Sequence, residues 1–213
     1  MTTLLVIAKQ PLPGRVKTRL TPPFTPEEAA ALAEAALADT LATAARVPAD
    51  RHVLVLDGEP GAWLPAGFAV LPQAAGGLDA RLAAAFATCR GPALLIGMDT
   101  PQVTPALLAP ALRWDAHDAW FGPAADGGFW ALGLASPDPA LVRGVPMSRP
   151  DTGAVQYERL RAAGLRVGTL PTVRDVDTAA DARRVAALAP GSRFAAVHTA
   201  LTAHEVAGAG VGT

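Results

Sequence analysis

Short apolar runs without a polar residue are the feature that most constrains the fold of this chain. Residues 4–8 and 93–96 are such runs. Continuous apolar stretches of this length are typical of strands that are buried on both faces of a sheet. Such strands occur where helices cover both sides of a mainly parallel sheet, so the runs favour an α/β domain.

The rest of the chain alternates predicted strands with predicted helices. Strands are expected over 52–56, 68–71, 119–121, 129–134 and 165–170, and helices over 26–46, 78–90, from 105, after 151, over 178–188 and after 190. Thr25, Pro26 and Glu28 form a capping-box pattern at the start of the first helix. The strands 119–121 and 129–134 are too close for a helical crossover, so they are expected to form a small antiparallel excursion beside the sheet. We expect one domain over 1–190, followed by a C-terminal helix and tail over 191–213.

Composition excludes several classes of protein. Hydrophobic residues make up 51% of the chain, charged residues 17%, and the net charge is −1. This balance gives no reason to expect nucleic acid or a membrane surface as a partner. Cys89 is the only cysteine, which rules out an intramolecular disulfide and a cysteine zinc site. The N-terminal segment has no basic region before its apolar run, so we expect a cytoplasmic protein.

A cationic loop follows the first predicted strand. Lys9, Arg15, Lys17 and Arg19 stand within eleven residues, around a Pro- and Gly-containing turn at Gly14. Such a turn leaves backbone N–H groups free to bind phosphate, and the cations can neutralise phosphates or a departing group. The spacing of a Walker A loop is absent. A solvated basic loop is the alternative interpretation.

A lone acid, Asp99, ends the buried run 93–96 and precedes Thr100 and Pro101. Open α/β sheets bind their ligands at the C-terminal ends of central strands. A carboxylate there is a hard oxygen ligand of the kind that Mg²⁺ or Mn²⁺ prefers. Asp99 could instead be the first residue of an Asx turn.

Two further acidic motifs lie near predicted strand ends. Asp126 precedes Gly127 and Gly128, whose backbone can approach a ligand closely, and Asp126 could orient or deprotonate an acceptor hydroxyl. An Asp-Gly hairpin turn fits the same residues equally well. Asp175 and Asp177 precede the last predicted helix over 178–188, where Asp177 and Thr178 could also serve as its N-terminal cap, with Asp181 completing the box.

Four motifs in order resemble one bacterial family. They are A-K-x-P-x-P-G-x-V-K-T-R-L in the first loop, G-M-D-T-P at 97–101, G-P-x-x-D-G-G-F at 122–129 and D-V-D-T at 175–178. Over about residues 3–190 the chain resembles the glycosyltransferase-like family of unknown function DUF2064, in the GT-A nucleotide-diphospho-sugar transferase superfamily. It is more distantly similar to molybdenum cofactor guanylyltransferase and 2-phospholactate guanylyltransferase. The resemblance implies a three-layer α/β/α, Rossmann-like GT-A fold with a mixed, mainly parallel sheet.

The resemblance also implies roles for individual residues. The basic loop would contact the nucleotide phosphates, and Asp99 would bind Mg²⁺ (or Mn²⁺) together with Asp175 or Asp177. Catalytic roles would fall to Lys17, Asp99 and Asp126. The phosphate- and nucleotide-binding set is Lys9, Gly14, Arg15, Lys17, Arg19, Gln73 and Arg81, and the acceptor side would be formed by Asp126, Gly127, Gly128 and Ser148.

Two segments depart from the family pattern. The segment from Gln73 to Arg81 resembles the family's Gln-Gly-Leu-Gly-x-Arg, which implies contact with the base and ribose, but Asp79 replaces a usual glycine. Asp79 could merely cap the following helix and pair with Arg81. Before Ser148, Met147 stands where relatives often carry an aromatic residue, which hints at a changed acceptor pocket.

These observations predict a metal-dependent transferase that uses a nucleotide donor. Nucleotidyl transfer from a nucleoside triphosphate to an anionic small-molecule acceptor, with release of pyrophosphate, is favoured by the density of cations in the first loop. Glycosyl transfer from a nucleotide sugar is the first alternative, and a noncatalytic nucleotide-binding protein is the second alternative. The sequence leaves the nucleobase, the acceptor and the oligomeric state open. A dinucleotide-dependent oxidoreductase is excluded because no G-x-G-x-x-G follows the first strand.

Overall fold

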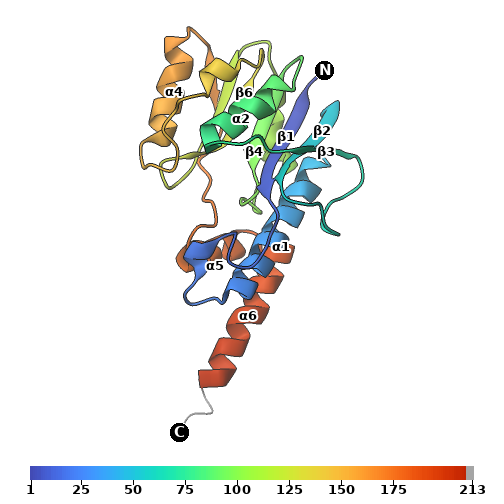
Figure 1. The fold of residues 1–213 in the computed structure, drawn as a ribbon, viewed down its shortest axis with the longest axis vertical. Coiled ribbons are helices and arrows are strands. Elements are labelled where there is room, and N and C mark those ends of the chain that lie inside the picture. Colours follow the sequence, from blue (N-terminus) through green and yellow to red (C-terminus); the bar gives the residue numbers. More distant parts are fainter. Residues whose placement is uncertain (210–213) are drawn as a thin grey trace.

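Seven strands form a single sheet in the order β3-β2-β1-β4-β6-β5-β7 in the computed structural model, which describes residues 1–209 (Figure 1). The strands are β1 (Thr3–Lys9), β2 (Arg51–Asp57), β3 (Phe68–Pro72), β4 (Ala93–Gly97), β5 (Ala119–Pro123), β6 (Phe129–Leu134) and β7 (Val167–Thr169). All neighbours pair in parallel except β6, which is antiparallel to both β4 and β5. The expected mixed, mainly parallel sheet is therefore confirmed.

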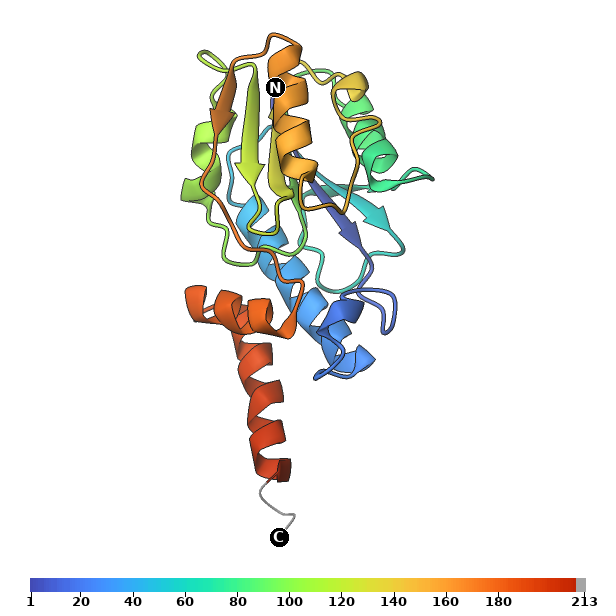
Figure 2. The same ribbon diagram turned by 90° about the vertical axis from the view of Figure 1, so that its left-hand side faces the viewer.

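Helices cover both faces of the sheet, as the apolar runs predict (Figures 1 and 2). Leu4 and Val6 of β1 pack in one core cluster with residues of α1 (Pro26–Ala44). Leu5, which points the other way, packs with α2 (Leu78–Ala87) and α4 (Thr152–Ala162) in a second cluster. Successive side chains of a strand point to opposite faces, so a strand between two helical layers needs apolar residues at every position. The three-layer α/β/α fold is confirmed.

The shorter elements complete the chain. They are α3 (Pro105–Leu108), α5 (Ala179–Leu188), α6 (Arg193–Ala209) and the 3₁₀ turns η1 (Thr18–Leu20), η2 (Ala109–Leu112) and η3 (Pro139–Leu141). The helices expected to start at residues 26 and 105 are present, and Thr25 and Thr104 each accept a backbone N–H in the first turn. The helix from residue 105 is short because Pro110 cannot donate the next hydrogen bond.

The antiparallel pair differs in one detail from the expectation. The strands β5 and β6 do not stand beside the sheet, because β6 is inserted between β4 and β5 and pairs with both. Because β6 runs antiparallel to β4, its first residue, Phe129, lies at the end of the sheet where β1 and β4 finish. The insertion therefore brings the loop between β5 and β6 to that edge.

A third core cluster joins α1, α5 and α6. Phe194 of α6 packs there with Leu32 of α1 and Val185 of α5, all buried. Asp39 of α1 ties the start of α6 to this cluster, because its carboxylate accepts the backbone N–H of Phe194 at 2.9 Å and Nη1 of Arg193 at 3.3 Å. Beyond this contact α6 extends away from the sheet (Figure 2).

The end of the chain carries two further observations. The tail expected at the C-terminus falls partly on residues 210–213, which lie outside the described residues. Within residues 1–209, the helices lack the length and apolarity that crossing a membrane would require.

Replacing Asp39 by alanine tests the docking of α6. The Asp39 side chain is only 10% exposed, and its loss would leave the buried amide of Phe194 without an acceptor. We expect the free energy of unfolding to fall by about 2 kcal/mol in urea denaturation. Asp50→Ala is the matched control, since Asp50 is 53% exposed where it pairs with the N-terminus, and it should lose less. Equal losses in the two variants would contradict this role for Asp39.

Candidate active site

The carboxyl ends of the central strands meet at a cleft of about 660 Å³. The strand order reverses at β1, because β2 and β3 lie on one side of it and β4 lies on the other. Open α/β sheets bind ligands at such a switch point. Register places Ile7 of β1 opposite Gly97 of β4, so the loop after β1 and the acid after β4 must leave the sheet side by side.

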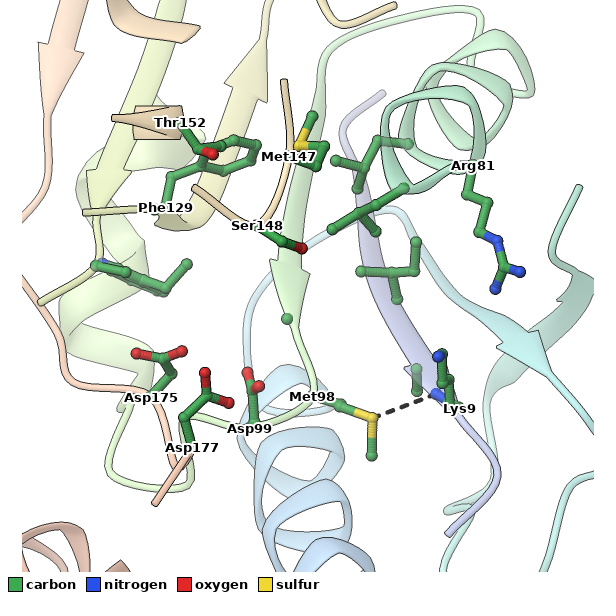
Figure 3. Close-up of a pocket in the computed structure, with 18 of the residues that line it drawn as sticks. Lys9, Arg81, Met98, Asp99, Phe129, Met147, Ser148, Thr152, Asp175 and Asp177 are labelled. Carbon is green, nitrogen blue, oxygen red and sulfur yellow. Dashed lines mark hydrogen bonds between the residues drawn. The ribbon is translucent and has the colours of Figure 1, made fainter. Parts of the chain in front are cut away.

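Three carboxylates converge at one end of this cleft (Figure 3). Asp99 follows β4, and Asp175 and Asp177 come from the segment between β7 and α5. One oxygen from each residue can be chosen so that the three atoms all lie within 4.8 Å of one another. Such a set, drawn from two segments that are distant in sequence, can hold a divalent cation.

Local structure explains why both late acids point into the cleft. Val176, which stands between them, is buried in the third core cluster. Its N–H donates to the carbonyl of Asp99 at 3.1 Å, which fixes this segment beside the end of β4. Val176 is thus buried away from solvent, whereas the side chains of Asp175 and Asp177 on either side of it line the cleft.

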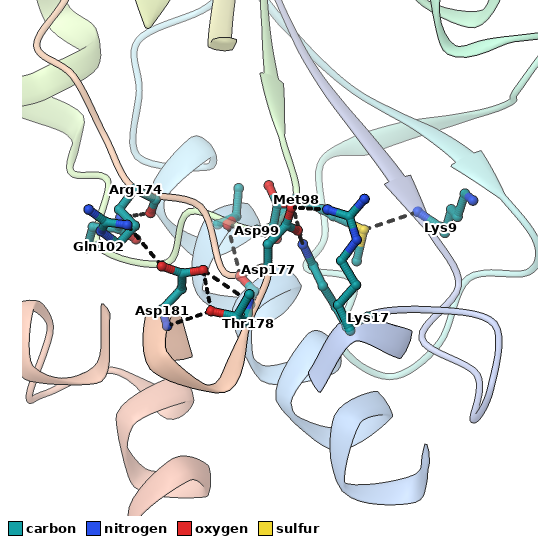
Figure 4. A network of polar contacts seen from close by, with 12 residues as sticks. Lys9, Lys17, Met98, Asp99, Gln102, Arg174, Asp177, Thr178 and Asp181 are labelled. Atoms are coloured by element: carbon teal, nitrogen blue, oxygen red, sulfur yellow. Dashed lines mark hydrogen bonds and ion pairs between the residues drawn. The ribbon is translucent and has the colours of Figure 1, made fainter. Parts of the chain in front are cut away.

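The helix cap proposed at this point is present, but Asp177 does not form it. Thr178 is the N-cap of α5, and it makes a complete capping box with Asp181. Arg174 pairs with Asp181 at 3.0 Å and supports the cap from the other side (Figure 4). The side chain of Asp177 is therefore left for the cleft.

Lys17 lies between the carboxylates (Figure 4). Its Nζ is 2.6 Å from Asp99 and 3.0 Å from Asp177, and its side chain is 11% exposed. Burial acts to lower the pKa of Lys17, but the charges of Asp99 and Asp177 and their hydrogen bonds outweigh it and raise the pKa above its ordinary value. Arg19 reaches the other oxygen of Asp177 at 3.3 Å from a far more exposed position.

Asp175 has a strongly perturbed carboxyl group. Burial, followed by the charges of Asp99, Asp126 and Asp177, raises its pKa to about 7. A carboxylate surrounded by others is costly to ionise. Burial and the neighbouring acids therefore favour the neutral form of the Asp175 carboxyl group.

Of the remaining residues of the basic loop, two line the cleft and one lines a neighbouring hollow. Lys9 and Arg15 line the cleft. Lys9 is held at the end of β1, where its backbone N–H donates to Sδ of Met98 at 3.2 Å. Gly14 has a φ of +71° and lines a smaller neighbouring hollow instead, where it allows the loop to reverse.

Gln73 and Arg81 form a fixed unit on the opposite side of the cleft. The Gln73 side-chain amide donates to the carbonyls of Ala8 (2.7 Å) and Val55 (3.2 Å), and its oxygen accepts Nη1 of Arg81 at 3.0 Å. Arg81 also binds Asp57 at 2.9 Å and the carbonyl of Gly76 at 3.0 Å. These bonds hold the guanidinium in one orientation.

The alternative that Asp79 caps α2 and pairs with Arg81 is wrong. Gly77 occupies the N-cap position of α2. The Asp79 carboxylate instead accepts the N–H of Gly144 at 2.8 Å, which lowers the pKa of Asp79. Asp57, the true partner of Arg81, was not predicted from the sequence, although it is an acid at a strand end like Asp99.

The Asp126 loop forms a turn, and it also borders the cleft. Asp126 accepts the N–H of Gly128 at 2.8 Å, as in an Asx turn, and it also lines the cleft. Gly127 has a φ of +92°, and a Cβ placed there would lie 2.0 Å from the carbonyl oxygen of Pro150. Gly127 therefore packs the loop against the segment before α4, while Gly128 faces the cleft.

Ser148 lines the cleft in a left-handed backbone conformation with a φ of 58°. Four further residues line the cleft on this side, and of these only the position of Met147 was singled out from the sequence. The additional lining residues on this side are Phe129, Met147, Arg149 and Thr152. Trp120 and Trp130 are buried, with 8% and 3% of their surface exposed.

Residues 29–149 match the model of a family described as "Uncharacterized protein conserved in bacteria (DUF2064)". This chain belongs to that family. The match confirms the resemblance inferred from the four motifs. No curated protein matches the chain.

Solved structures share this fold. A provisionally named nucleotide-diphospho-sugar transferase from Desulfovibrio desulfuricans G20 has a TM-score of 0.83 at 28% identity, over 96% of this chain and 95% of that one. Rv0371c from Mycobacterium tuberculosis H37Rv, in complex with manganese, has a TM-score of 0.53 at 23% identity, over 86% and 96%. The 2-C-methyl-D-erythritol 4-phosphate cytidylyltransferase from Thermus thermophilus has a TM-score of 0.55 at 18% identity, over 89% and 100%. At these lower identities, the last two show a common fold only.

The raised pKa of Asp175 predicts a pH-dependent stability. The folded protein binds the carboxyl proton of Asp175 more tightly than the unfolded chain does. The free energy of unfolding therefore falls as the pH rises from 3.8, the ordinary pKa of this group, to about 7. In metal-free buffer, Asp175→Asn should therefore be more stable than the wild type at pH 8, and the difference should shrink toward pH 5. Urea denaturation at several pH values measures this difference. A difference that does not change between pH 5 and pH 8 would contradict the assignment.

Proposed function

We propose that this chain is a metal-dependent transferase that uses a nucleotide donor, most simply a nucleotidyltransferase. The observation that carries the proposal is the convergence of Asp99, Asp175 and Asp177 with Lys17 at the switch point of the sheet. Carboxylates and cations at one site suit a substrate whose phosphates are bound both through a divalent metal and directly. The 28% identity with a protein named as a nucleotide-diphospho-sugar transferase supports the same class.

The three carboxylates are suited to hold Mg²⁺ or Mn²⁺. Their oxygens are hard ligands, and they lie close enough to share one ion. A cation bound there would also offset the burial and the repulsion by Asp99, Asp126 and Asp177 that raise the pKa of Asp175. A divalent ion bound there would neutralise charge on the donor phosphates and on the leaving group.

The basic loop would bind the donor phosphates. Lys9, Arg15, Lys17 and Arg19 all line the cleft, and their charges would stabilise negative charge that develops on the departing group. A triphosphate needs more such charge than a diphosphate, which favours nucleotidyl transfer. Gly14 would serve the same loop through its turn rather than through direct contact.

Gln73 and Arg81 would act together on the nucleotide. The amide of Gln73 is already used by two carbonyls and by Arg81. We therefore assign Gln73 to positioning, while the remaining N–H groups of the Arg81 guanidinium are presented to the nucleotide. Asp57 supports the same orientation from the end of β2.

The acceptor would enter on the side of Asp126 and Ser148. Asp126 uses one oxygen for the N–H of Gly128, so the other can orient an acceptor hydroxyl or take its proton. Gly127 would hold the loop against Pro150, and Gly128 would let the acceptor approach the backbone. Ser148 would add a hydroxyl to this wall.

In nucleotidyl transfer, an anionic oxygen of the acceptor attacks the α-phosphorus in line. A new oxygen–phosphorus bond forms, the bond from the α-phosphorus to the bridging oxygen breaks, and pyrophosphate leaves toward Lys17 and the other loop cations. The contribution of this chain is to align the two reactants and to receive the charge of the leaving group.

Glycosyl transfer is the second candidate, because the similar protein from D. desulfuricans is named as a nucleotide-diphospho-sugar transferase. There the acceptor would attack the anomeric carbon, and a nucleoside diphosphate would leave. The leaving group separates the candidates. Incubation with nucleotides, nucleotide sugars and an acceptor library should release pyrophosphate if the first candidate is correct. Release of a nucleoside diphosphate from a nucleotide sugar would favour the second, and binding without turnover would favour a noncatalytic nucleotide-binding protein.

Asp99→Asn tests the metal-dependent binding directly. A panel of nucleotides is added with and without Mg²⁺ while the melting temperature is followed. A bound nucleotide at about 100 times its dissociation constant should raise the melting temperature of the wild type by roughly 5–10 °C, only with Mg²⁺. Asp99→Asn should lose this increase, whereas the control Asp115→Asn, at an exposed acid outside the cleft lining, should keep it. Equal responses of Asp99→Asn and the wild type would refute the metal site.

A further inference from the structure

Lys17 binds two of the carboxylate groups that the proposed function assigns to a metal. Its Nζ contacts Oδ2 of Asp99 at 2.6 Å and Oδ1 of Asp177 at 3.0 Å (Figure 4). These are two of the three acids whose oxygens lie within 4.8 Å of one another. A divalent ion shared by these acids would lie within a few ångströms of the ammonium, where two like charges repel strongly in a partly buried site.

We infer that Lys17 competes with the metal for Asp99 and Asp177, and that it transfers to the donor phosphates when metal and nucleotide bind together. This inference rests on the proposed function. Metal alone must displace the ammonium from two short ion pairs, so it binds weakly. Donor phosphates supply the displaced ammonium with new anionic partners, so metal and nucleotide strengthen the binding of each other.

The loop is built so that only the side chain of Lys17 has to move. Val16 beside it is buried in the core, and Lys17 is the N-cap of η1, where its carbonyl accepts the N–H of Leu20. The four-carbon stem of a lysine can place its ammonium several ångströms away without a change in the backbone. Lys9 and Arg15 line the same cleft, so the phosphates that would receive the ammonium are expected within this reach.

Lysine at this position also serves the protein when no metal is bound. It supplies a positive charge among three acids, which would otherwise repel one another. The ordinary view of a phosphate-binding lysine predicts no effect on metal affinity in the absence of nucleotide. Competition predicts that removing the ammonium makes the metal bind more tightly.

The test measures Mn²⁺ binding without nucleotide, by electron paramagnetic resonance of the free ion. Lys17→Met, which keeps the length of the side chain but removes its charge, should bind Mn²⁺ at least about tenfold more tightly than the wild type. A nonhydrolysable nucleoside triphosphate should strengthen Mn²⁺ binding of the wild type by about 5- to 150-fold, the usual range of coupling between sites. That enhancement should be much smaller in Lys17→Met.

Two further variants make the result decisive. Arg161→Met removes one positive charge from an exposed position about 14 Å along α4 from Thr152, and it should leave Mn²⁺ affinity unchanged. Lys17→Gly replaces Lys17→Met if the latter does not fold, because Lys17 has a φ of 48° and a ψ of 39°, a left-handed conformation that glycine adopts freely.

The outcomes separate this inference from the proposed function. Unchanged or weaker Mn²⁺ binding in both Lys17 variants, with measurable binding in the wild type, would overturn the competition and leave the metal site standing. Failure of every variant and of the wild type to bind Mn²⁺, with or without nucleotide, would overturn both.

Discussion

The hydrogen bond from the N–H of Val176 to the carbonyl of Asp99 holds together the two segments on which the site depends. Asp99 leaves the end of β4, whereas Asp175 and Asp177 belong to a segment that follows the last strand of the sheet. Burial of Val176 fixes which way that segment faces. With this contact in place, the carboxylates on either side of Val176 lie close to that of Asp99. The capping box at Thr178 then starts α5 without using the side chain of Asp177.

Concentrating carboxylates in this way has an electrostatic cost, and the chain offsets it locally. The net charge of the protein is close to zero, so no general field balances the acids. Lys17 and Arg19 lie against them from the loop after β1, and the parallel pairing of β1 with β4 places that loop beside Asp99. Burial and the charges of the neighbouring acids together raise the pKa of Asp175 to about 7. A site in which an ammonium already lies between carboxylates is suited to exchange one cation for another.

Much of this arrangement could be predicted from the sequence, for identifiable reasons. An apolar run such as 4–8 has few uses other than a strand buried on both faces, and a lone acid at the end of such a strand lies where ligands bind. The contacts of Lys17 could not be predicted, because they join residues 82 and 160 positions apart. The insertion of β6 into the sheet and the partnership of Arg81 with Asp57 depend likewise on the packing of distant segments. Periodicity and capping patterns describe neighbours in sequence, and they carry no information about such contacts.

The central claim is that Asp99, Asp175 and Asp177 bind one divalent metal together with a nucleotide. The most direct measurement is an anomalous difference map from crystals grown with Mn²⁺ and a nonhydrolysable nucleoside triphosphate. The account predicts a single strong peak within about 2.0–2.3 Å of carboxylate oxygens of these residues, with phosphate oxygens completing the coordination and Lys17 against the phosphates. Nucleotide density without a metal peak, with Lys17 still bound to Asp99 and Asp177, would contradict it.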